Sequence, residues 1–352
     1  MTPRRFCAAD GLPAGDALAE GPPAGRSRGA LCPHPAAAGR KIGVIHNPLS
    51  RAGRTGSARF GAAAAGLPLA EPASRAELRD ALRGFAAEGV DLLAVQGGDG
   101  TLREVLTAMP GAFGDRPPAV AVLAAGKVNL AARALGGAGR GEAALRRLLD
   151  AAGRGALRRR LAPVLEVRRP GPGGEAPPLR GLLLGAAAFT EGNRLAEARL
   201  HRRGVHDGAA VALALAGVAL RAGFDRRHPL RAGVPMRVSV DDGPPREGRR
   251  FLLLATTLDR LMLGLRPFWG DGRGAVRWLD VAAPPRRLAA ALWAGGRGKP
   301  EPWMAPAGYL SGRAERLEIA MDEPFVLDGE VFEPGPDGVL LSASDRVAFV
   351  SP

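Results

Sequence analysis

Short apolar runs that alternate with helical segments are the feature that most constrains the fold of this chain. Ile42–His46, Val90–Gln96 and Ala119–Ala124 are short and almost continuously apolar. The segment Ser74–Glu88 between the first two runs places its apolar side chains at helical spacing. Strands that are apolar on both faces and are separated by helices indicate a parallel sheet covered on both sides. We therefore predict an α/β fold for the first half of the chain. The further helices predicted there are Leu102–Met109, closed by Pro110 and Gly111, then Leu130–Leu135 and Glu142–Ala151.

The pattern changes after about residue 160, where short strand-like runs are separated by turns rich in glycine and proline. The predicted strands are Pro163–Arg168, Gly181–Phe189, Met236–Val240, Phe251–Thr257, Ala275–Val281 and Leu317–Ala320. Two predicted helices, Ala209–Arg221 and Arg286–Ala294, interrupt them. This half is expected to be an antiparallel, β-sandwich-like domain.

Four segments follow from these patterns. Residues 1–40 carry no periodicity and are expected to be a disordered leader. Residues 41–160 are expected to form the α/β domain and residues 161–340 the β-rich domain. Residues 341–352 are expected to form a terminal strand that returns to the first domain.

Charge and cysteine content narrow the classes of function. The net charge is +14, yet the arginines are scattered and aromatic residues make up only 5% of the chain. This favours an anionic lipid surface or a phosphorylated ligand over nucleic acid, because single-strand binding needs aromatic stacking platforms. Both cysteines, Cys7 and Cys32, lie in the leader, which excludes a disulfide framework and favours a reducing compartment. No run reaches the 18 or so apolar residues of a membrane-spanning helix.

The strongest chemical signal is the run Gln96-Gly97-Gly98-Asp99-Gly100-Thr101, placed between a predicted strand and a predicted helix. Glycines let a backbone approach a ligand closely, and a helix N-terminus presents unpaired N–H groups that suit phosphate. Thr101 is expected to cap the helix, with Glu104 completing a capping box. A phosphate-binding loop is therefore predicted at the carboxyl end of a parallel strand.

The sequence resembles the diacylglycerol kinase catalytic-domain family, which phosphorylates diacylglycerol, sphingoid bases and related lipids. The resemblance spans residues 41–352. It rests on four motifs in order: Asn47-Pro48-Leu49-Ser50, Gly97–Thr101, Gly126-Lys127-Val128-Asn129 running into Leu130-Ala131-Ala132-Arg133, and Leu327-Asp328-Gly329-Glu330.

The resemblance implies an ATP- and Mg²⁺-dependent lipid kinase, cytoplasmic and peripheral at the inner membrane surface. The implied nucleotide-binding residues are Asn47, Gly97, Gly98, Asp99, Gly100, Thr101, Gly126, Lys127 and Asn129. Asp99 is expected to hold Mg²⁺ through water beside the phosphates. Glu330 is the implied base for the lipid hydroxyl, supported by Asp328. One residue separates the two, so on a strand they would face the same side.

Two positions depart from the family pattern or match it poorly. Lys127 stands where the family usually has threonine, and a lysine there can supply a point charge to a phosphate. Asp271 lies where some bacterial relatives bind a structural metal, but the surrounding Trp269–Gly272 matches poorly, so it is only a candidate ligand.

Three alternatives stay open at the level of sequence. NAD kinase shares the Gly-Gly-Asp-Gly-Thr loop, although its downstream Asn-Glu pair is missing and only Glu191-Gly192-Asn193 is present, in the reverse order. A degenerate kinase that binds nucleotide or lipid without turnover is the second alternative, and a scaffold at anionic membranes is the third.

Overall fold

The computed structural model describes residues 32–33, 40–48, 50, 60, 63–126, 129–171, 177–203, 225, 227–261 and 264–352, of which 196–203 are described by their backbone alone. The elements discussed below belong to one compact unit, Leu31–Pro352. The predicted helix Ala209–Arg221 lies outside the described residues.

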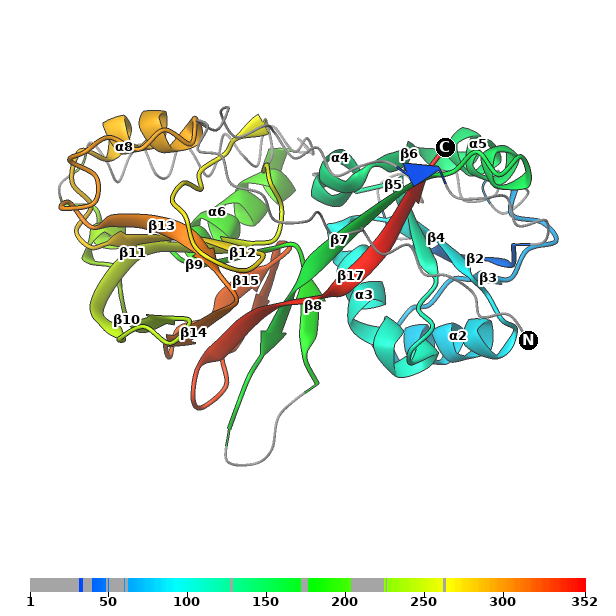
Figure 1. Cartoon of the computed structure of the whole chain (residues 1–352), viewed down its shortest axis with the longest axis horizontal. Coiled ribbons are helices and arrows are strands. Elements are labelled where there is room, and N and C mark those ends of the chain that lie inside the picture. The colour runs from blue at the N-terminus through cyan, green and yellow to red at the C-terminus, as the bar shows by residue number, and fades with distance from the viewer. Residues whose placement is uncertain are drawn as a thin grey trace, which may run out of the picture. The chain divides into compact units, whose positions relative to one another are not determined.

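A parallel sheet forms the first half of this unit (Figure 1). The strand β2 (Ile42–His46) lies between β3 (Leu69–Ala70) and β4 (Leu92–Gly97), and β4 pairs in turn with β5 (Ala119–Ala124). The short strand β6 (Gly137–Gly139) continues the parallel order beyond β5. The predicted parallel sheet is therefore confirmed.

Helices cover both faces of this sheet because successive strand residues point to opposite sides. Ile45, Leu93 and Val120 lie in one apolar cluster with the buried faces of α2 (Arg75–Ala87) and α3 (Asp99–Phe113). Val44, Ala94 and Leu123 lie in a second cluster with α5 (Gly141–Gly153). A further helix among the described residues of this half is α4 (Leu130–Leu135).

The second half is antiparallel, as predicted. Its strands are β7 (Arg158–Arg168), β8 (Leu179–Gly181), β9 (Leu183–Ala187), β10 (Val234–Val240), β11 (Arg246–Thr256), β12 (Val276–Ala282), β13 (Tyr309–Ala314), β14 (Arg316–Ala320), β15 (Phe325–Leu327), β16 (Glu330–Phe332) and β17 (Val339–Ser351). The helices α6 (Ala188–Arg203) and α8 (Leu288–Gly296) and the 3-10 turn η1 (Pro229–Ala232) accompany them. The two-residue strand β1 (Cys32–Pro33) pairs with β7.

The last strand joins the two kinds of sheet. β17 runs antiparallel to β7 along most of its length, as the red and green arrows of Figure 1 show. Near its end Phe349 lies opposite Val120 of β5 in a parallel pairing. The C-terminal strand thus borders the parallel sheet directly.

Three local predictions were wrong. Helix α3 begins at Asp99 and continues past Pro110 to Phe113, because a proline in the last turn removes only its own N–H while its carbonyl still accepts from Gly114. The predicted strand Gly181–Phe189 divides into β8 and β9, and Phe189 belongs to α6, where its ring lies against Gly185.

The predicted capping box is the third error. The N-cap of α3 is Gly98, without a side-chain cap, and Thr101 lies inside the first turn. Glu104 does not reach back to the helix start, because two arginines bind its carboxylate instead.

Candidate active site

A pocket of about 580 Å³ opens where β2 and β4 end. Its lining comes from the loop after β2, from the starts of α2 and α3, from the loop after β5 and from β16. The residues concerned are Ile45, His46, Asn47, Ser50, Pro72, Ala73, Ser74, Arg75, Leu78, Gly98, Gly100, Thr101, Arg103, Glu104, Gly126 and Glu330. The volume lies in the range of small-molecule and cofactor sites.

Two glycine loops touch backbone to backbone at the floor of this pocket. A Cβ added at Gly126 would lie 2.5 Å from the Cα of Gly98, a distance at which something must shift. The N–H of Ala125 donates to the carbonyl of Gly97 at 2.9 Å, which holds the loops after β4 and β5 together. Only glycine at these positions permits so close an approach.

The first turn of α3 faces the pocket. The first helical bond runs from the N–H of Leu102 to the carbonyl of Gly98, so the preceding N–H groups lack helical acceptors. Gly98, Gly100 and Thr101 all line the cavity. Unpaired N–H groups and the positive end of a helix dipole suit an anionic ligand such as a phosphate ester.

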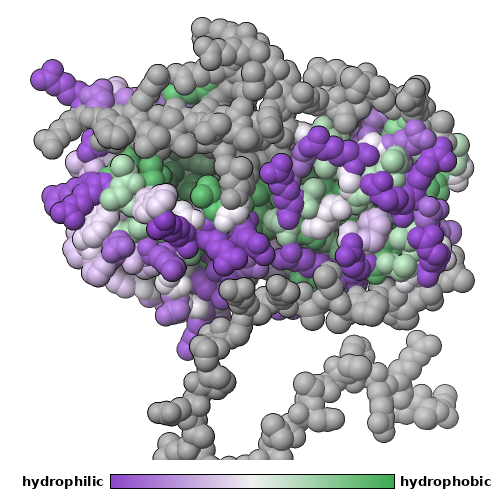
Figure 2. Space-filling model, turned by 90° about the horizontal axis from the view of Figure 1, so that it is seen from above, coloured by the Kyte–Doolittle hydropathy of each residue, from purple (hydrophilic) through white to green (hydrophobic). Residues whose placement is uncertain are grey.

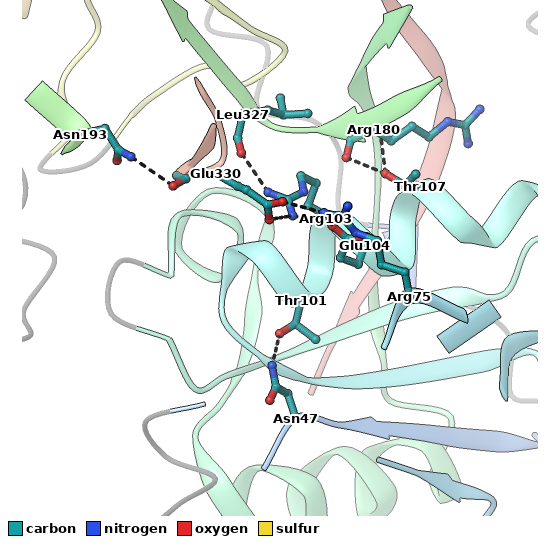
Figure 3. Close-up of polar contacts among 11 residues, drawn as sticks. Asn47, Arg75, Thr101, Arg103, Glu104, Thr107, Arg180, Asn193, Leu327 and Glu330 are labelled. Carbon is teal, nitrogen blue, oxygen red and sulfur yellow. Dashed lines mark hydrogen bonds and ion pairs between the residues drawn. The ribbon is translucent and has the colours of Figure 1, made fainter. Parts of the chain in front are cut away.

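Both predicted asparagines organise these loops. Asn47 Nδ2 donates to Thr101 Oγ1 at 2.9 Å, which ties the loop after β2 to α3 (Figure 3). The side chain of Asn129 accepts from the N–H of Gly126 at 3.0 Å and donates to its carbonyl at 2.8 Å. Asn129 also has a φ of 53°, a left-handed conformation that asparagine tolerates. Lys127, between these two partners, lies outside the described residues, and its role stays a prediction.

Asp99 caps a neighbouring helix. Its two carboxylate oxygens accept from the N–H groups of Leu130 and Ala131, each at 3.1 Å, at the start of α4. Burial raises the pKa of Asp99, while these hydrogen bonds act in the opposite direction. The carboxylate therefore connects the glycine-rich loop to α4 through direct contacts to backbone amides.

Asp328 occupies a tight turn. Asp328 and Gly329 have φ values of 49° and 89° and form the two-residue link between β15 and β16, a hairpin turn that requires positive φ. The Asp328 carboxylate accepts from the N–H groups of Leu182 and Leu183 at 2.9 and 3.0 Å. Burial and the charge of Asp99 raise the pKa of Asp328 to about 7.

The prediction that Asp328 and Glu330 share one strand face is wrong, because the turn separates them. Asp328 points to the break between β8 and β9, whereas Glu330, the first residue of β16, points to α2 and α3.

Two arginines hold Glu330 (Figure 3). Arg75 Nη2 lies 2.6 Å from Glu330 Oε1, and Arg103 Nη2 donates to the other oxygen. Partial burial raises the pKa of Glu330, but the charges and hydrogen bonds of Arg103 and Arg75 outweigh it, so the pKa is lowered. Glu330 is thus an ionised carboxylate at the rim of the pocket.

Arg103 is the buried centre of this network. It is 2% exposed, its Nη1 donates to the carbonyl of Leu327 at 3.1 Å, and its Nη2 contacts Glu104 at 2.6 Å. The guanidinium carbon lies 5.0 Å from the ring centre of Phe332. Arg103 therefore joins α3 to the hairpin β15–β16.

Sequence reasoning missed three members of the network: Arg75, Arg103 and Glu104 as an ion-pair partner. Their signal was weak, because exposed arginines and glutamates are common on helices. Only the position of Arg103 indicated burial, since it lies between Leu102 and the buried Val105 and Leu106 on a helix that packs against the sheet.

The described side chains do not present a set of ligands for Mg²⁺. No group of three His, Cys, Asp or Glu residues suited to a metal occurs among them, and Asp271 is an exposed side chain. The carboxylates of Asp99 and Asp328 accept from backbone N–H groups and that of Glu330 from arginines. We therefore derive no step through a metal. In the part of the chain that the structure describes, no helix has the length and apolarity to cross a membrane.

A parallel sheet with a glycine-rich loop before a helix places this pocket at the carboxyl ends of the strands, where open α/β sheets bind their ligands. Residues 41–156 match the family model of the diacylglycerol kinase catalytic domain, which confirms the resemblance to that family. No curated protein is significantly similar to the chain.

Solved structures with the same fold come from Bacillus anthracis str. Sterne. One, described as a candidate diacylglycerol kinase, has 16% sequence identity and a TM-score of 0.58, and the match covers 89% of this chain and 97% of that one. Another, described as a diacylglycerol kinase, has 15% identity and a TM-score of 0.54, with 88% and 96% covered. At this identity the similarity establishes the fold.

Proposed function

We propose that this protein is a lipid kinase that transfers the γ-phosphoryl group of ATP to a hydroxyl of diacylglycerol or a related lipid. The observation that carries the proposal is the arrangement of the pocket. The glycine cradle and the start of α3 lie on one side of it, and the Glu330 carboxylate lies at its rim. The match of residues 41–156 to the diacylglycerol kinase catalytic domain supports the same reaction class.

In this proposal the phosphates of ATP lie against Gly98, Gly100 and Gly126, where the unpaired N–H groups at the start of α3 stabilise negative charge. The lipid hydroxyl oxygen attacks the γ-phosphorus, the bond to the bridging oxygen breaks, and ADP leaves. The hydroxyl proton passes to the carboxylate of Glu330. Catalysis of phosphoryl transfer depends mainly on positioning the reacting groups and stabilising the charge of the phosphoryl group. A carboxylate of low pKa is therefore sufficient to orient the hydroxyl.

Arg75 has a position that suits a second role in this reaction. Its side chain is 57% exposed, it lines the pocket, and it pairs with both Glu330 and Glu104. An incoming phosphate competes with these carboxylates for the guanidinium. We propose that Arg75 turns towards the nucleotide and thereby releases one oxygen of Glu330 for the hydroxyl.

The proposal is tested by incubating the purified protein with radiolabelled ATP and vesicles that contain diacylglycerol, monoacylglycerol, sphingosine or ceramide, with NAD as a further acceptor. We expect a labelled lipid product, and Glu330→Gln should lower kcat by about 10²–10⁴-fold while changing ATP affinity little. Labelling of NAD alone would instead identify an NAD kinase-like enzyme.

A second candidate, a degenerate nucleotide-binding protein, is favoured by one specific observation. Both oxygens of Glu330 are already bound by arginines, whose charges lower the pKa of the carboxylate and so weaken it as a base. This candidate predicts that ATP binds in a calorimetric titration while no lipid of the panel is phosphorylated. It also predicts that Glu330→Gln leaves ATP binding unchanged.

A further inference from the structure

Large apolar side chains are exposed at few described positions, and they are not scattered evenly. The exposed ones are Leu69, Leu161, Leu265, Leu292 and Trp293. The last three of them gather at helix α8. Trp293 is the most exposed of all, at 68%.

Helix α8 is apolar on both of its faces. Its sequence, Leu-Ala-Ala-Ala-Leu-Trp-Ala-Gly-Gly, contains no polar side chain. Leu288, Ala291 and Gly295 are buried, the first two in the apolar cluster of β11 and β12. Ala289, Leu292 and Trp293 lie on the opposite side and are exposed, in agreement with the helical spacing of three and four residues. Because this face is apolar yet exposed, it has no packing partner within the described part of the chain.

The loop before β12 extends this apolar face. The N–H of Arg266 donates to the carbonyl of Gly296 at 3.1 Å, which fixes the loop against the end of α8. A Cβ added at Gly296 would lie 3.4 Å from Cδ2 of Leu265, so the two segments are in van der Waals contact. Leu265 therefore continues the surface that Leu292 and Trp293 begin.

Cationic residues edge the same surface. Between Asp280 and Glu301 the chain carries four basic residues and no acidic one: Arg286, Arg287, Arg297 and Lys299. They lie just before and just after α8, and all four are exposed. The guanidinium of Arg297 lies 3.6 Å from the ring centre of Trp293. Figure 2 views the molecule from the side on which α8 lies in Figure 1, and apolar and strongly hydrophilic surface alternate there.

We propose that the exposed face of α8, with Leu265, docks onto an anionic lipid bilayer. The apolar side chains would enter the headgroup region, tryptophan is enriched at that depth, and the arginines and Lys299 would meet lipid phosphates. Charge complementarity commits the surface to an anionic bilayer, because the charged residues between Asp280 and Glu301 are all cationic and flank exposed leucine and tryptophan side chains. The inference deepens the proposed function by naming the surface that meets the bilayer carrying the substrate, yet its test needs neither ATP nor turnover.

The experiment is co-sedimentation of the full chain with vesicles of phosphatidylcholine, with and without phosphatidylglycerol. We expect binding that requires the anionic lipid and weakens with salt. The double variant Leu292→Ser and Trp293→Ser should bind at least about tenfold more weakly, because it removes the apolar anchor. The double variant Arg286→Gln and Lys299→Gln should lose about fivefold for each charge.

Leu161→Ser is the matched control, because Leu161 is 47% exposed and lies on β7, away from α8 in the sequence. It should bind vesicles as the parent protein does. Equal binding by the parent protein and the Leu292/Trp293 variant would overturn the proposal. So would a dimer that the same variant abolishes in analytical ultracentrifugation, since a second copy would then be the occupant. Failure of phosphorylation with vesicle binding intact would reject the kinase function alone.

Discussion

Arg103, almost fully buried, donates through Nη2 to one carboxylate oxygen of Glu330, which itself lies half exposed at the pocket rim. The pair links α3, whose first turn belongs to the candidate phosphate site, to β16, which carries the candidate base. A carboxylate fixed from below by a buried guanidinium has a defined position relative to the glycine loops. The second oxygen is bound by the exposed Arg75, so its contact is easier to break than the contact of the first oxygen with the buried Arg103.

Replacing Arg103 should destabilise the protein. Arg103→Met leaves Glu104, Glu330 and the carbonyl of Leu327 without their common donor. We expect a loss of about 3 kcal/mol in the free energy of unfolding, at the lower end for a broken buried ion pair, since Glu330 is partly exposed. Arg103→Lys, which keeps the charge, should lose less. Urea unfolding checks both variants, and a loss in Arg103→Met below about 1 kcal/mol would contradict the central role of this side chain.

Replacing Arg75 should change the pH profile more than the stability. Arg75→Gln removes one of the cations that lower the pKa of Glu330, so that pKa rises. Glu330 then becomes protonated at a higher pH, and the acidic limb of the kcat/KM profile moves to higher pH. The free energy of unfolding should change by less than about 1 kcal/mol, as for exposed ion pairs. Arg83→Gln is the control, because Arg83 is a similarly exposed arginine of α2 that pairs with Asp80. If the parent protein and both variants have the same pH profile of kcat/KM, the contact between Arg75 and Glu330 has no role in the reaction.

Local patterns predicted β2, β4 and β5 of the parallel sheet, because these buried strands are short, almost continuously apolar runs. They also predicted the position of the glycine loops. They failed where a side chain acts across a long sequence separation. Asp99 binds the start of α4, 31 residues away, and Asp328 binds Leu182, 146 residues away. No local pattern encodes such partners.

The long sequence separation of its partner also explains why the role of Arg103 was not predicted. Its partner Glu330 is 227 residues distant, and the hairpin that brings them together was itself too short to be recognised as two strands. The four motifs and their order allowed the family resemblance to place Glu330 near the loops, whereas composition and spacing alone would not have done so.

Asp99→Asn should disturb the site through α4. The amide has one acceptor oxygen where the carboxylate bonded the N–H groups of both Leu130 and Ala131. Loss of such a cap typically costs about 1 kcal/mol. We also expect a fall in kcat of about 10²-fold or more, since the glycine loop is held by this carboxylate. If the effect runs through α4, excess Mg²⁺ should not restore activity. Full recovery at high Mg²⁺ would show instead that Asp99 serves the metal.

Gly126→Ala should weaken ATP binding and lower stability. The new Cβ would lie 2.5 Å from the backbone of Gly98, and backbone atoms cannot move aside as a flexible side chain does. Forced overpacking of this kind costs about 1–3 kcal/mol and would separate the two loops of the cradle. Gly84→Ala is the control, because a Cβ at Gly84 meets nothing within 4 Å on helix α2, where alanine is favoured. Calorimetric titration with ATP and urea unfolding measure the ATP affinity and the stability of both variants. Equal values for the two would show that the contact between Gly126 and Gly98 is not needed for ATP binding.

The stability of the protein should depend on pH through Asp328. Burial and the nearby charge of Asp99 raise its pKa in the folded protein to about 7, whereas Arg103 and the N–H groups of Leu182 and Leu183 act in the opposite direction. The ordinary aspartate pKa is 3.8, so between these values the folded state holds a proton that the unfolded state has released. Its contribution to stability is therefore present at low pH and is lost as the pH rises towards 7, with a slope of at most about 1.4 kcal/mol per pH unit.

Asp328→Asn removes this titration, since the amide stays neutral. The difference in unfolding free energy between the parent protein and the variant should therefore change steadily in favour of the variant from pH 5 to pH 7 and then level off. Urea unfolding at several pH values measures this difference, and the carboxylates that do not interact with Asp328 cancel because both proteins contain them. A difference that is constant across this range would mean that the two N–H donors keep Asp328 ionised in the folded state.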